Sequence, residues 1–149
     1  IFIDPVVLDI ELDSVTYRLK EDVGLTDEQI GRATILYRMF LHLKKKYPKK
    51  PIAPTKIMDV FWHQHILDTQ KYMADCEMLF GEFAHHNPHV RGDELTPFWE
   101  ESLALMKEEF GIAPEMNLVR DVRMEPLVPS VKKEVKGKTK TNHKNAVCH

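Results

Sequence analysis

Cysteine is scarce in this chain, with only Cys76 and Cys148 among its 149 residues. One lies inside a helical pattern and the other stands beside the last residue, so they provide no disulfide framework. The opening residues, IFIDPVV, lack the basic and apolar regions of a signal peptide. These observations favour a reducing compartment, and we expect a cytoplasmic protein.

Long apolar runs are missing as well, and none approaches the ~20 residues that a membrane-spanning helix needs. We therefore expect no membrane partner. The chain also has no motif that by itself names a reaction, such as HExxH or a CxxC pair. With 43% hydrophobic and 30% charged residues, its composition is that of one globular domain.

Acidic charge is rare at the C-terminal end, where residues 126–149 contain six lysines and one glutamate. This segment carries a net charge of +5, which leaves −7 for residues 1–125. Because it has few apolar side chains, it predicts a disordered basic tail after a single helical domain over residues 1–125. Nucleic acid would be contacted only through this tail, but the tail lacks arginine and aromatics, so we expect it to be simply solvated.

Helical periodicity dominates the rest of the chain. Thr26 and Gln29 form a capping box that starts a helix ending before Pro48. His42 lies off the apolar stripe of this helix, so we interpret it as an ordinary surface or boundary residue. A second helix is expected from Thr55 and a third up to Gly81, with a break near Asp68; His85 to Glu94 reads as a loop. The last predicted helix runs from Pro97 to Phe110. The predicted fold class is therefore all-α.

The N-terminal segment is different, because residues 6–19 alternate between apolar and polar side chains. This period of two suits two short strands or an extended arm. A lone hairpin is marginal, and no other segment offers strand partners. We predict an extended or partly helical arm packed along a helical body.

Candidate chemistry is concentrated between Asp59 and Pro88, which hold four of the eight histidines. His63 and His65 would point about 160° apart on an unbroken helix, so they could share one ion only if the helix unwinds. Asp59 with His63, and His65 with Asp68, do share a face. His85 and His86 follow the predicted helix that ends at Gly81, and both of their rings could turn toward one ion there. The candidate metal ligands are His63, His65, His85, His86, Asp68 and Asp59.

Imidazole nitrogens suit Zn, Fe, Cu or Ni, so the expected cofactor is a divalent transition metal of undetermined identity. For any single residue a structural role is the simpler interpretation, since a histidine beside Trp62 can be a satisfied boundary residue and Asp68 can be a helix cap. Cys76 and Tyr72 lie on an apolar stripe and read as core. The density of histidine and aspartate in one stretch is what favours a site.

The same stretch resembles the central motif of the glycine-rich domain-containing protein-like family, in the string DxFWHxHILDTxxYxxDCxxxFGxFxHHxP. The similarity extends from about Leu8 to Gly111. With six glycines and no glycine-rich region, the chain departs from the larger members. The resemblance implies a functional unit and no particular reaction.

Two functions from different classes remain open. The first is a metalloenzyme of unknown reaction, in which the histidines ligate an ion and Asp68 or Asp59 acts as ligand or base. The second is a non-catalytic interaction module, in which the histidines are structural and the helical surface or the tail engages a protein. The partner is accordingly an unidentified small molecule or protein.

Truncation after Glu125 should leave the fold intact. The removed residues are polar and rich in lysine, so the free energy of unfolding should change by at most about 1 kcal/mol. Urea denaturation of the truncated and full-length proteins measures this. A large loss of stability in the truncated protein would show that the tail is structural.

Overall fold

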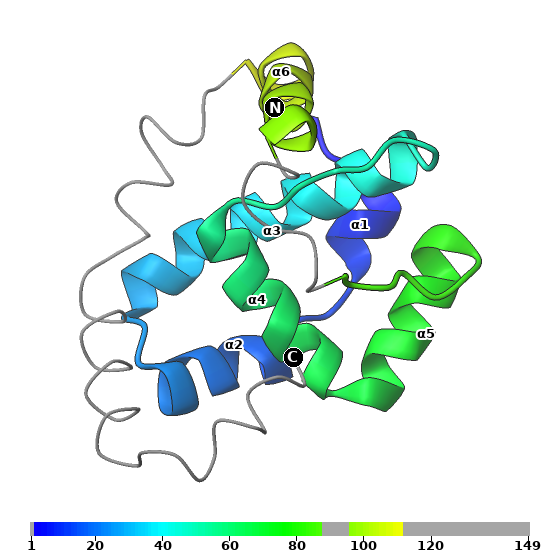
Figure 1. Ribbon diagram of the computed structural model, residues 1–149. Helices are drawn as coiled ribbons and strands as arrows, with labels where there is room; N and C mark the ends of the chain where they lie inside the picture. The colour runs from blue at the N-terminus through cyan, green and yellow to red at the C-terminus, as the bar shows by residue number, and fades with distance from the viewer. Residues whose placement is uncertain (1, 88–95, 112–149) are drawn as a thin grey trace, which may run out of the picture.

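The computed structural model describes residues 2–87 and 96–111 (Figure 1). It confirms the all-α prediction, since the described residues form helices and no strand. The predicted tail at residues 126–149 lies outside the described residues, as does most of the loop expected between His85 and Glu94.

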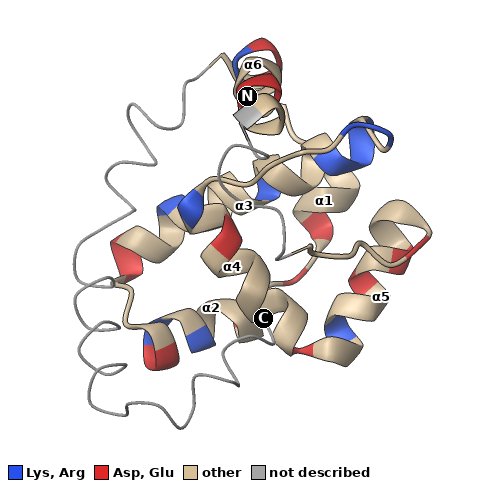
Figure 2. Cartoon of the chain, viewed as in Figure 1, with Lys and Arg blue, Asp and Glu red and all other residues tan. Residues whose placement is uncertain are grey.

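Helix α3 (Asp27–Lys46) is the central element and crosses the middle of the molecule (Figure 1). Its start is fixed by the predicted capping box: the Thr26 hydroxyl accepts from the Gln29 N–H at 3.1 Å, and the Gln29 side chain accepts from the Thr26 N–H at 2.9 Å. Three lysines occupy its last turn, where they offset the negative end of the helix dipole (Figure 2). Because Leu36, Tyr37 and Phe40 are fully buried, the other helices pack around this one.

Helices α4 (Lys56–Leu67) and α5 (Thr69–Phe80) follow as a pair. The predicted break falls at Asp68, whose φ of −89° and ψ of 77° are not helical. Gly81 ends α5 with a φ of 75°, a left-handed conformation that glycine adopts without strain. The chain then turns back toward α4 (Figure 1). This return brings residues 82–87 to the side of α4.

The N-terminal arm is helical, with α1 (Pro5–Asp9), α2 (Asp13–Arg18) and the π-helix η1 (Leu19–Val23). Of the two forms left open, it therefore takes the partly helical one. Arg38 of α3 fastens it by donating to the backbone oxygens of Val7 at 2.6 Å and Ile10 at 3.0 Å. The apparent alternation arose because short helices with turns between them bury side chains at irregular intervals, here Val7, Ile10, Leu12, Val15 and Leu19.

Helix α6 (Thr96–Phe110) packs on α3 through Glu109. The Glu109 carboxylate lies 2.6 Å from the Lys46 ammonium and accepts from the Tyr47 hydroxyl at 2.8 Å. His42 faces the same carboxylate at 3.4 Å, and its other ring nitrogen accepts from the Asp4 N–H at 3.0 Å. The interpretation of His42 as a surface or boundary residue is wrong, because its ring is buried between three segments.

Glu109 should stabilise the fold in a pH-dependent way. Its pKa is lowered mainly by the hydrogen bond from Lys46 and also by those from Tyr47 and His42. A carboxyl group with a lowered folded pKa contributes stability that is complete above the ordinary glutamate pKa of about 4.3 and is lost as the pH falls below it. Glu109→Gln should therefore lower the urea midpoint at pH 7, and the difference from wild type should shrink as the pH falls below about 4.3. Glu108→Gln, an exposed neighbour, is the control. A wild-type advantage that persists undiminished at pH 3 would contradict the assignment.

Candidate metal centre

Helix α4 holds the first two residues of the candidate centre, Asp59 and His63. They are four residues apart on an unbroken helix, so their side chains share one face. The His63 Nε2 atom lies 3.3 Å from the Asp59 carboxylate. The backbone of α4 thus fixes one carboxylate and one imidazole together.

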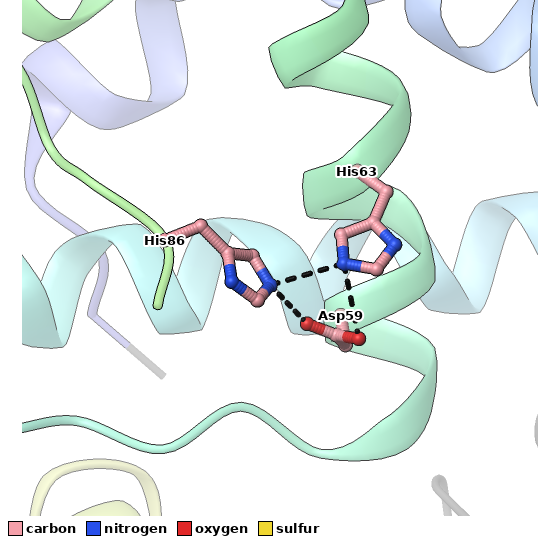
Figure 3. Close-up of side chains that lie close together, drawn as sticks. All are labelled: Asp59, His63 and His86. Carbon is pink, nitrogen blue, oxygen red and sulfur yellow. Dashed lines mark hydrogen bonds and ion pairs between the residues drawn. The ribbon is translucent and has the colours of Figure 1, made fainter. Parts of the chain in front are cut away.

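His86 completes the cluster from the segment after α5 (Figure 3). Its Nε2 atom lies 2.7 Å from Asp59 Oδ1 and 3.0 Å from the Nε2 atom of His63. These three residues are half-buried and could hold one metal ion, since their ligand atoms all lie within 4.8 Å of one another. The Trp62 indole stacks on the His86 imidazole, with 4.3 Å between ring centroids and 28° between planes.

Three of the six predicted ligands are therefore together. His65 lies on another side of α4, because the helix does not unwind and its two histidines diverge as helical geometry requires. Its Nδ1 atom meets the Tyr37 hydroxyl at 2.7 Å and its Nε2 atom meets Asp75 at 2.8 Å. Burial lowers the pKa of His65, against the opposing effect of Asp75. Both ring nitrogens are thus engaged inside the core.

His85 and Asp68 also lie outside the cluster. His85 is exposed, and its ring contacts Phe83 with 4.8 Å between centroids. Asp68 stands at the junction of α4 and α5, where its carboxylate accepts from the Ser14 hydroxyl at 3.5 Å and makes no side-chain hydrogen bond to cap α5. Of the adjacent histidine pair, the structure therefore selects His86.

A family model that covers residues 12–119 matches this chain, and its description is UCP032817-like. The chain belongs to the UCP032817-like family. This family is uncharacterised. The resemblance to the glycine-rich domain-containing protein-like family is wrong, because the motif at residues 59–88 lies within the UCP032817-like match. That interpretation relied on the motif at residues 59–88, in a chain with six glycines and no glycine-rich region. No curated protein and no solved structure matches the chain.

Two further properties of this UCP032817-like chain bear on function. Among residues 2–87 and 96–111, no helix is both long enough and apolar enough to cross a membrane. Cys76 is buried in the hydrophobic core, and burial raises the pKa of its thiol. It therefore packs as the sequence predicts, and its thiol is not activated.

The three close contacts of the cluster cannot all be hydrogen bonds. Each Nε2 atom offers one position in the ring plane, occupied either by a hydrogen or by a lone pair, so each takes part in one good hydrogen bond. If both rings donate to Asp59, the two nitrogens at 3.0 Å face each other without a bond between them. A metal ion would receive the lone pairs of both nitrogens and the carboxylate oxygen at once. Asp59, His63 and His86 of this UCP032817-like chain are thus a group that could hold one metal ion.

The contact of His86 with Asp59 and His63 could not be predicted from sequence spacing. The sequence nevertheless contains one signal for the site, the Trp62–His63 dipeptide. The spacing of Asp59 and His63 was among the alternatives left open. The stacking of Trp62 on His86 is a tertiary contact that the sequence did not predict. The WH dipeptide places an aromatic ring and a ligand on neighbouring faces of α4, which is the signal that could have indicated it.

His65 should prove structural. In His65→Ala the Tyr37 hydroxyl and the Asp75 carboxylate lose a buried partner, so the free energy of unfolding should fall by about 1–3 kcal/mol. Urea denaturation with and without chelator should show the same loss. The exposed His85→Ala control should change stability by no more than about 0.5 kcal/mol. A His65→Ala protein as stable as wild type would contradict this role.

Proposed function

We propose that this protein binds a divalent transition-metal ion through Asp59, His63 and His86. The observation that carries the proposal is the convergence of two Nε2 atoms 3.0 Å apart with one carboxylate between them. No arrangement of hydrogens satisfies all three contacts, whereas a single ion would accept lone pairs from both nitrogens and from the carboxylate.

The spacing of the ligand atoms agrees with a shared ion. Two atoms that are each about 2.0–2.1 Å from one ion lie about 2.9–3.4 Å apart, at bond angles from 90° to tetrahedral. The nitrogen–nitrogen distance of 3.0 Å and the distance of 3.3 Å from His63 Nε2 to Asp59 Oδ2 fall in this range. The distance of 2.7 Å from His86 Nε2 to the other carboxylate oxygen, Asp59 Oδ1, is slightly shorter and would lengthen on binding.

The ligand set suits an open coordination sphere. Two imidazoles and one carboxylate are the ligands of catalytic zinc sites and of non-haem iron(II) sites, which keep at least one position for water or substrate. Structural zinc sites use four protein ligands, commonly with cysteine. We therefore propose zinc or iron(II) ahead of copper or nickel, and a metalloenzyme ahead of a structural zinc domain.

The tautomer of His86 can adapt to an ion. When Nε2 gives its lone pair to a metal, the ring hydrogen must be on Nδ1. This buried Nδ1 atom has no hydrogen-bond partner in the part of the chain that the structure describes. Within the described residues, no contact at Nδ1 therefore opposes a hydrogen on that atom.

The interaction-module alternative accounts for His65, whose nitrogens are both bonded within the core. It does not account for the cluster, where a structural role would leave one close contact unsatisfied. The metal proposal explains both histidines of the cluster and leaves His65 its structural role.

Metal retention tests the proposal. Untagged protein, loaded with Zn, Fe(II), Cu or Ni in turn and dialysed, should retain about one ion per chain for at least one of them. Asp59→Asn, His63→Ala and His86→Ala should each weaken binding by more than about tenfold, since each removes a ligand. His85→Ala is the matched control, because it changes the neighbouring exposed imidazole. The proposal would be contradicted if His85→Ala lost as much metal affinity as the three ligand variants, or if the wild-type protein retained no ion.

A further inference from the structure

A buried chain of two hydrogen bonds joins α4, α5 and the segment that carries His86. The indole N–H of Trp62 donates to the Tyr72 hydroxyl at 2.9 Å, and that hydroxyl donates to the backbone oxygen of Ala84. Tyr72 is 2% exposed, so water does not take the place of either partner. The hydroxyl therefore connects three segments that have no covalent contact at this point.

Both ends of this run of hydrogen bonds, Trp62 and Ala84, lie next to residues of the candidate metal centre. Trp62 precedes His63 on α4, and its ring stacks on His86 at 4.3 Å. Ala84 lies two residues before His86 in the same segment. The Tyr72 hydroxyl thus orients the ring that covers His86 and holds the backbone that carries it.

The segment depends on such side-chain contacts. Within the described residues, no backbone–backbone hydrogen bond is formed by residues 82–86. Besides the bond from Tyr72, the Ala84 backbone lies beside the Cys76 thiol, a weak hydrogen-bonding group. The Tyr72 ring also packs edge-on against Phe83, with 5.2 Å between centroids. The contacts that hold residues 82–86 against α5 are therefore made largely by Tyr72.

We propose that Tyr72 is a positioning residue for His86: its hydroxyl holds the segment of His86 so that the His86 imidazole lies against His63 and Asp59 of α4. The inference rests on the proposed metal site for its consequence and on the hydrogen bonds alone for its geometry. A phenylalanine keeps the ring packing but neither accepts from Trp62 nor donates to Ala84.

With Co(II) as the probe, Tyr72→Phe should weaken metal binding by about 10- to 100-fold, as is usual when a residue that orients a metal ligand is lost. The visible absorption of bound Co(II) reports both affinity and coordination geometry. The matched control is Tyr37→Phe, which also removes a buried hydroxyl but one bonded to His65. It should lose stability comparably and keep the Co(II) affinity of wild type within about twofold.

A second readout needs no metal. The carbon-bound protons of the His86 ring lie against the indole face, so their NMR signals should be shifted upfield in wild type and in Tyr37→Phe. In Tyr72→Phe these signals should return toward the values of an unstacked histidine. If Tyr72→Phe does not fold, Trp62→Phe can replace it. This variant removes the indole N–H that donates to the Tyr72 hydroxyl, and it should also weaken Co(II) binding.

The outcomes separate the two proposals. If wild type binds no Co(II) through His63, the metal site fails, and the ring-proton shifts still decide whether Tyr72 positions His86. Unchanged His86 shifts in Tyr72→Phe would overturn the positioning role. So would equal loss of Co(II) affinity in the two tyrosine variants, since that loss would reflect general destabilisation.

Discussion

The candidate centre depends on helix α4 remaining unbroken past His65. Each residue turns a helix by about 100°, so four residues bring Asp59 and His63 onto one face, and two residues carry His65 away from His63. One face of α4 therefore contributes a carboxylate and an imidazole to the cluster, while His65 joins Tyr37 and Asp75 in the core. The same short sequence thus supplies a polar core contact and two potential ligands without competition between them.

The third ligand depends on tertiary structure. The break at Asp68 starts α5, and the left-handed Gly81 ends it so that the following residues return to α4. Trp62 and Tyr72 then hold that return by stacking and hydrogen bonding. A bound ion would join α4 to this segment directly, so metal binding and the order of the segment are expected to reinforce each other.

Local signals in the sequence predicted the helices well, because capping and periodicity act over a few residues. The Thr26 capping box, the break near Asp68 and the pairing of Asp59 with His63 are of this kind. Burial of His42, the core bonds of His65 and the choice of His86 over His85 depend on partners 10 to 67 residues away, which spacing does not reveal. The partly helical arm was ambiguous because its short helices bury irregularly spaced side chains.

Anomalous diffraction from crystals of the untagged protein grown with Zn(II) or Co(II) tests the central claim most directly. The account predicts an anomalous peak within bonding distance of Asp59, His63 and His86, about 2.0–2.2 Å from each ligand atom. The His65 ring should keep its contacts to Tyr37 and Asp75 in the same crystals. A map with no peak between these three residues, or with the only peak at His65 or His85, would contradict the account.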